Sequence, residues 1–228
     1  MADSKAPPPQ ARRLDLLIVN PDSSAQAYQD LAAIHSAIEP PVWGLLLAEA
    51  CRRKGFGVAI LDCDAERLTL DQAVARIEDA APRLLLFCVY GQNPNSGTTS
   101  MIGALRLAAA AKDQAPDRPI AFVGSHPSAL PREVLAHSCV DIVLIGEGVY
   151  ALQDLLRSDL RDDLARVPGI GHKPRDGGGH GVLNPGARIV PQARMDRDLP
   201  GYAWDLLPLR ERPLDLYRAH LWHAGFDP

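Results

Sequence analysis

The sequence is short of aromatic residues, of cysteine and of positive charge, and each shortage narrows the class of protein. Aromatic residues make up 5% of the 228 residues although hydrophobic residues reach 46%, so the core depends on aliphatic side chains. The net charge of −4 gives no sign of the clustered basic residues that nucleic-acid binding needs. No apolar run is long enough to span a bilayer, and the first residues lack the apolar segment of a secretory signal. We therefore expect neither a nucleic-acid partner nor a membrane span.

The four cysteines are Cys51, Cys63, Cys88 and Cys139, and no two of them form a CxxC pair. Widely spaced single cysteines are typical of reduced thiols in the cytosol, whereas disulfide frameworks and zinc sites bring cysteines together at short spacings. The pattern predicts a cytoplasmic protein.

Five short, nearly continuous apolar runs follow a proline-rich segment, residues 1–13, that is expected to be a disordered tail. Such runs are typical of strands buried on both faces of a parallel sheet, and they cover residues 14–20, 58–62, 84–90, 120–124 and 141–146. Helix-like segments alternate with them, which predicts an α/β fold: a doubly wound, flavodoxin- or Rossmann-like parallel sheet of five strands. The flavodoxin-like strand order is the more common for five strands.

The expected helices carry local signals of their ends. Thr69 and Gln72 have the spacing of a capping box before a helix at 69–81. A helix from Trp43 is followed by Gly55, and a third at 98–114 ends before Pro116. Two shorter helices are expected at 131–138 and 150–160.

Beyond residue 160 the texture changes, and we expect one domain at 14–160 followed by a hairpin and connector at 161–228. Two apolar pieces flank a glycine-rich turn and predict a β-hairpin added to the domain. His172 and His180 flank this turn and are expected to face solvent. The last residues are rich in proline and aromatic residues without clear periodicity, which predicts a connector that packs on something.

In open α/β sheets, ligands bind beyond the carboxyl ends of the strands, so the residues after each strand are the candidate site. They are residues 20–22, Cys63 and Asp64, the stretch 91–96, residues 124–127 and residues 146–148. Most are small, or carry amide and hydroxyl groups, and lysine and arginine are absent from them. Such a set suits a large, mostly neutral ligand with many amide groups.

Each stretch also has an ordinary structural explanation. Asn20-Pro21 is a common turn, residues 91–96 could cap the next helix, and His126 could be a hydrogen-bonded turn histidine. A GxGxxA match at 146–151 lies on the last strand of the domain, where a dinucleotide fingerprint is not expected. A phospho-acceptor receiver domain, a flavodoxin phosphate loop, a P-loop and a GxSxG nucleophile elbow all lack their required residues.

Several segments in order carry a family resemblance: "PPVWGLLLAEACRRKGFGVAILDCDAERL", "VYGQNPNS", "GSHPSALP", "IGEGVYALQDLL" and "DLPGYAWDLLPL". Together they resemble the N-terminal cobalamin-binding domain of cobalamin-dependent radical S-adenosylmethionine (SAM) enzymes, of which the anaerobic magnesium-protoporphyrin monomethyl ester cyclase is the best-known type. The resemblance implies a corrinoid over the carboxyl ends of the strands. It implies cofactor contacts from Asn20, Pro21, Tyr90, Gln92, Asn93, Ser96, Gly124, Ser125, His126, Gly146, Glu147 and Gly148.

The sequence departs from this pattern in two ways. The DxHxxG motif that supplies an axial histidine in other cobalamin proteins is missing, which leaves His126 as the candidate for cobalt and direct ligation as the less favoured alternative. The CxxxCxxC motif that holds a 4Fe–4S cluster is also missing. The cluster and S-adenosylmethionine are therefore expected in a radical SAM domain outside this chain, in cis or in trans.

The leading interpretation is a cobalamin module of a radical SAM methyltransferase or cyclase, unable to start radical chemistry alone. The alternative is a flavodoxin-like module that binds a small ligand or nucleotide without a corrinoid. A protein-interaction domain is a third hypothesis and rests on the aromatic C-terminal segment alone.

Overall fold

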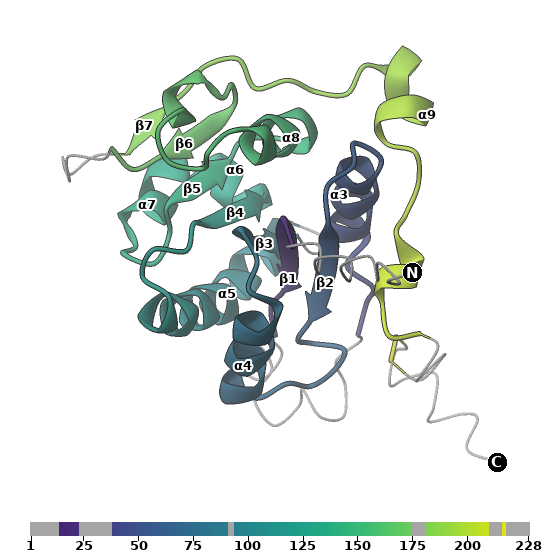
Figure 1. Ribbon diagram of the computed structural model, residues 1–228, viewed down its shortest axis with the longest axis vertical. Coiled ribbons are helices and arrows are strands. Elements are labelled where there is room, and N and C mark those ends of the chain that lie inside the picture. The colour runs from purple at the N-terminus through teal and green to yellow at the C-terminus, as the bar shows by residue number, and fades with distance from the viewer. Residues whose placement is uncertain (1–13, 23–37, 91–93, 175–180, 210–215, 218–228) are drawn as a thin grey trace, which may run out of the picture.

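Five parallel strands form the centre of the molecule in the computed structural model (Figure 1). The structure describes residues 14–22, 38–90, 94–174, 181–209 and 216–217, with residues 94–96 described by their backbone. The strands are β1 (Leu16–Asn20), β2 (Val58–Asp62), β3 (Leu84–Val89), β4 (Ile120–Gly124) and β5 (Ile142–Leu144), in the order β2-β1-β3-β4-β5. This is the flavodoxin-like order, so the predicted fold class and strand order are confirmed.

The strands are buried because alternate side chains pack against helices on both faces of the sheet. On one face, leucines and isoleucines of β1 and β3 pack with α3 (Val42–Arg52) and α8 (Val149–Arg157). On the other face, Phe87 and Phe122 stack with ring centroids 5.0 Å apart beneath α4 (Leu70–Ala80) and α5 (Pro94–Gln114). Figure 1 shows these two helical layers on opposite sides of the sheet.

Local signals place most helix ends correctly, and the exceptions lie near the carboxyl edge. The capping box at α4 is present: the Thr69 hydroxyl accepts from the Gln72 amide, and the Gln72 side chain accepts from the Thr69 amide. Helix α5 begins at Pro94 rather than at Thr98, because proline is favoured in a first turn. The expected turn after β4 is instead a five-residue helix, α6 (Ser125–Ala129), followed by α7 (Pro131–Ala136).

The predicted hairpin is present and continues the same sheet. Its strands are β6 (Ile170–His172) and β7 (Val182–Leu183), and β6 pairs antiparallel with β5, which gives a seven-stranded sheet. The prediction that His172 faces solvent is wrong. His172 is only 8% exposed, because it is the last residue of β6 and pairs with Ile142 within the sheet. The glycine-rich turn and His180 lie outside the described residues.

The chain after β7 runs past the helices α8 and α3 and is hydrogen-bonded to both (Figure 1). We call residues 190–209 the connector; it contains short helical turns, among them α9 (Met195–Asp198) and η4 (Trp204–Leu206). The Tyr150 hydroxyl donates to Asp198 at 2.7 Å, and the Ala203 amide donates to the Leu45 carbonyl at 3.3 Å. These hydrogen bonds hold the connector on α8 and α3.

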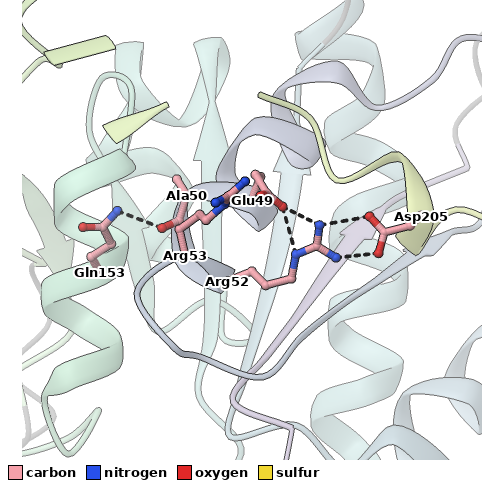
Figure 2. Close-up of polar contacts among 6 residues, drawn as sticks. All are labelled: Glu49, Ala50, Arg52, Arg53, Gln153 and Asp205. Carbon is pink, nitrogen blue, oxygen red and sulfur yellow. Dashed lines mark hydrogen bonds and ion pairs between the residues drawn. The ribbon is translucent and has the colours of Figure 1, made fainter. Parts of the chain in front are cut away.

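Figure 2 shows the contact between α3 and the connector in detail. Arg52 lies between Glu49 on its own helix and Asp205 on the connector, and its guanidinium bonds both carboxylates. On the opposite side of α3, the Gln153 amide donates to the Ala50 carbonyl at 3.3 Å. Helix α3 is thus bonded to both α8 and the connector. Within the described residues, no helix combines the length and the apolar character needed to cross a membrane.

Candidate functional site

The parallel sheet brings most of the predicted site residues to one edge, where the carboxyl ends of β1 to β5 lie. We call this the carboxyl edge. The described members are Asn20, Pro21, Tyr90, Gly124, Ser125, His126, Gly146, Glu147 and Gly148. Ser96 lies in the first turn of α5, where the backbone alone is described, and Gln92 and Asn93 fall outside the described residues.

At the β1–β2 end of this edge, the Asn20 side chain is hydrogen-bonded to the buried carboxylate of Asp62. Its Nδ2 donates to Asp62 Oδ1 at 2.8 Å, and the Ala65 amide donates to the same oxygen at 3.1 Å. Tyr217, far away in the sequence, donates its hydroxyl to Asp62 Oδ2 at 2.8 Å. Burial raises the pKa of Asp62, although its hydrogen bonds from Asn20, Ala65 and Tyr217 favour the ionised form. Sequence reasoning missed both Asp62 and Tyr217.

At the β3–β4 centre of the edge, two glycines permit close contacts: Gly124 between the ends of β3 and β4, and Gly97 between the first turn of α5 and Ser125. A Cβ on Gly124 would lie 2.1 Å from the Val89 carbonyl oxygen. A Cβ on Gly97 would lie 2.5 Å from Ser125 Oγ, which is the side chain of a half-buried residue. A side chain at Gly124 would therefore clash with the Val89 carbonyl, and one at Gly97 would clash with the Ser125 hydroxyl.

His126 is held beside the same turn of α5. Its Nδ1 lies 3.2 Å from Thr98 Oγ1, and the residue is half-buried. A hydrogen bond at Nδ1 fixes the orientation of the ring and leaves Nε2 as the second polar atom of the side chain. Within the described residues, no group of three histidine, cysteine or acidic side chains could hold a metal ion.

At the β5 end, aromatic side chains hold the loop of residues 145–148. The Tyr90 hydroxyl donates to the Gly146 carbonyl at 3.2 Å, and Trp43 Nε1 donates to the Glu147 carbonyl at 3.1 Å. The two rings pack with centroids 5.4 Å apart. Burial raises the pKa of Tyr90 to about 12, so its hydroxyl remains protonated and able to donate near neutral pH. Sequence reasoning missed Trp43.

Two further hydrogen bonds complete the attachment of this loop. The Gly146 amide donates to Ser128 Oγ at 3.0 Å, which ties the loop to α6. The Val190 amide at the start of the connector donates to the Glu147 carboxylate at 2.7 Å. Tyr90 and Glu147 were predicted as cofactor contacts, and the structure shows them bonded to the protein's own loop and connector.

The glycines of this loop have different surroundings. Both Gly146 and Gly148 have a φ of +76°, a left-handed conformation that favours glycine. A Cβ on Gly148 would lie 3.0 Å from Val123, so this position is closely packed. Gly146 is exposed, and a Cβ there would meet no atom within 4 Å. The loop therefore presents bare backbone with free space beside it.

The donor set of the carboxyl edge fits a neutral, amide-rich ligand such as a corrinoid. Two of its carboxylates, Asp62 and Glu147, accept hydrogen bonds from the protein itself. Ser125 offers a hydroxyl and His126 an imidazole, and open space lies beside the backbone of Gly146. A macrocycle with amide side chains needs neutral donors and acceptors and a shelf without bulky side chains.

A family model described as a B12 binding domain matches residues 31–156, which is more than half of the chain. The chain belongs to the B12 binding domain family. The match runs from before α3 to the last turn of α8 and so includes the loops of the carboxyl edge after β2, β3, β4 and β5. This match confirms the predicted relation to cobalamin-binding domains and the predicted cofactor class, cobalamin.

Solved structures of cobalamin-dependent radical SAM enzymes share the fold of this B12-binding chain. The methyltransferase TsrM from Kitasatospora setae, with cobalamin and a 4Fe–4S cluster bound, has a TM-score of 0.58 and 19% identity over 79% of this chain. The same enzyme with tryptophan and a SAM analogue bound gives a TM-score of 0.57, 19% identity and 77% coverage. The cobalamin-dependent SAM radical enzyme OxsB, in its apo form, has a TM-score of 0.55 and 15% identity over 85% of this chain.

The chain spans 30% of the length of TsrM and 24% of that of OxsB. At these identities the likeness concerns the fold. No curated protein sequence matches the chain.

Proposed function

We propose that this chain binds cobalamin on the carboxyl edge of its sheet, as the corrinoid module of a longer radical SAM enzyme. The observation that carries the proposal is the B12 binding domain match over residues 31–156, because the loops inside that range form most of the carboxyl edge. The neutral donor set and the open space at Gly146 agree with such a ligand.

Within this proposal the edge residues have two kinds of role. Ser125, His126 and the backbone at Gly146 face the ligand, and Gln92, Asn93 and Ser96 are further proposed cofactor contacts. Tyr90 and Glu147 hold the loop of residues 145–148 in place, Gly148 permits close packing behind it, and Gly124 permits close packing between the ends of β3 and β4. Bound cobalamin would supply a cobalt that carries a methyl group or electrons.

The parent enzyme is proposed to be a methyltransferase or a cyclase whose radical chemistry occurs in a second domain. The chain has no CxxxCxxC motif, and its four cysteines are buried and free. Burial raises the pKa of Cys51, Cys63, Cys88 and Cys139, which keeps these thiols protonated and unsuited to hold a cluster. The solved relatives with this fold include a radical SAM methyltransferase. Reduced, buried thiols also suit the proposed cytoplasmic location.

The test is a comparison of two ligands on the purified chain. The protein is mixed with hydroxocobalamin or with flavin mononucleotide and desalted, and the visible spectrum of the protein fraction is recorded. We expect retention of hydroxocobalamin and not of the flavin. Retention of the flavin alone would support the flavodoxin-like alternative instead.

A bulky substitution then locates the site. Gln92→Trp and Asn93→Trp should abolish retention of hydroxocobalamin, while Ile102→Trp, on an exposed face of α5, should leave it unchanged. Unchanged retention in the first two variants would move the site away from this part of the edge.

A further inference from the structure

The carboxylate of Asp62 joins two parts of the chain that lie far apart in the sequence. Asp62 is the last residue of β2 and is 1% exposed. It accepts hydrogen bonds from Asn20 at the end of β1, from the Ala65 amide and from the hydroxyl of Tyr217. Tyr217 is 155 residues away along the chain, and its neighbour Leu216 is 5% exposed.

This arrangement fixes the orientation of the Asn20 amide group. The carboxylate can only accept, so the Nδ2 group of Asn20 is directed to Asp62 and its amide oxygen is left as an acceptor. A buried carboxylate that loses a donor must find another or remain partly unsatisfied, which is costly. The position of Tyr217 therefore influences how firmly the Asn20 amide is held.

We propose that Asn20, Asp62 and Tyr217 couple cobalamin binding at the carboxyl edge to docking of residues 216–217 against Asp62. The inference rests on the proposed function. A corrinoid presents amide N–H groups, for which the amide oxygen of Asn20 is a suitable acceptor. Asp62 is a positioning residue in this scheme, because it acts through Asn20 and through Tyr217.

The reason for the coupling is reciprocal stabilisation. When Tyr217 donates to Asp62, the Asn20 amide is oriented before the ligand arrives, and less order has to be imposed on binding. By linkage, a ligand that binds the oriented amide more tightly must in turn favour the docked position of Tyr217.

The first test removes one hydroxyl group at each of two tyrosines. Tyr217→Phe takes one donor from Asp62, while Tyr202→Phe makes the same change at a residue that is 44% exposed on the connector. Titration with hydroxocobalamin should give a Kd at least about fivefold higher for Tyr217→Phe, the lower end of usual coupling between sites. The Kd of Tyr202→Phe should equal that of the wild type.

The second test measures the reverse direction of the coupling. Hydroxocobalamin should slow amide hydrogen exchange at residues 216 and 217 in the wild type, and this protection should be lost in Asp62→Asn. A purely structural role of Tyr217 would not make exchange at these residues depend on the ligand.

The outcomes separate the two proposals. If the wild type retains cobalamin but the two tyrosine variants share its Kd and exchange at 216 and 217 does not change, the coupling is wrong and cobalamin binding stands. If the wild type retains no cobalamin, the proposed function fails and the coupling fails with it.

Discussion

Glycine 146 shows how a single residue shapes the carboxyl edge. Its amide and carbonyl groups are bonded to Ser128 and Tyr90, so the loop is held although the residue has no side chain. Free space lies where a Cβ would stand. A fixed backbone beside an open volume is a suitable surface for a flat macrocycle.

Two substitutions at this glycine test whether the open volume belongs to the ligand. Gly146→Ala and Gly146→Phe share the cost of a side chain at a φ of +76°, so their apo stabilities should be similar. The phenyl ring would occupy the space proposed for the corrinoid. We therefore expect the Kd for hydroxocobalamin to be about tenfold higher in the phenylalanine variant than in the alanine variant, which corresponds to a loss of about 1.4 kcal/mol of binding free energy. Equal Kd values would place the ligand elsewhere.

The carboxyl edge could be predicted from the sequence at the residues that directly follow strands. Asn20, Ser125, His126 and Gly146 were found because strand ends can be read from apolar runs. Residues that reach the edge through tertiary contacts were missed. Trp43 bonds a residue 104 positions away, and Tyr217 bonds one 155 positions away, and neither carries a local signal.

At the scale of elements, helix α3 contains a buried carboxylate, Glu49, that is paired with two arginines of the same chain segment. Glu49 is 6% exposed and is bonded by both Arg52 and Arg53 (Figure 2). Burial acts to raise the pKa of Glu49, but its hydrogen bonds from Arg53 and Arg52 outweigh burial, and the pKa is lowered. Arg52 continues the contact to Asp205, so ionisation of Glu49 helps to hold the connector on α3.

This predicts a specific dependence of stability on pH. Because the pKa of Glu49 is lower in the folded state, the unfolded chain binds more protons in acid. The stabilisation is complete above the unfolded pKa of about 4.3 and is lost as pH falls through the folded value. Urea unfolding at pH 7 and at pH 3 should show a smaller loss of stability in Glu49→Gln than in the wild type. An equal or larger loss in the variant would contradict this role.

The capping box of α4 allows a second prediction for an element. Thr69→Ala removes the acceptor for the Gln72 amide and should lower the free energy of unfolding by about 1 kcal/mol, within a range of about 0.5–2. Thr69→Ser keeps the hydroxyl and should remain close to the wild type. The measurement is urea unfolding at neutral pH, and equal values for the alanine and serine variants would show that the cap does not stabilise α4.

Elements with strong local patterns were predictable, and those set by neighbours were not. The parallel strands and α4 follow from apolar runs and a cap. The residues after β4 were expected to form a turn and instead form the short helix α6, whose Pro127 lies in the first turn, where proline is tolerated. That the hairpin would pair with β5 could not be foreseen, since it depends on the free edge of that strand.

At the scale of the whole molecule, the strand order places the reversal of the sheet between β1 and β3. In such sheets the ligand crevice lies outside the carboxyl ends at this point. Residues from the C-terminal part of the chain bond to both ends of the carboxyl edge: Val190 of the connector to Glu147, and Tyr217 to Asp62.

If the carboxyl edge of this sheet is a shelf for a corrinoid, a crystal structure of the chain grown with hydroxocobalamin should show the ligand there. We expect density for a corrin ring in contact with Ser125, His126 and the backbone of Gly146. Density on another face of the sheet, or crystals of folded protein without any corrinoid at this ligand concentration, would contradict it.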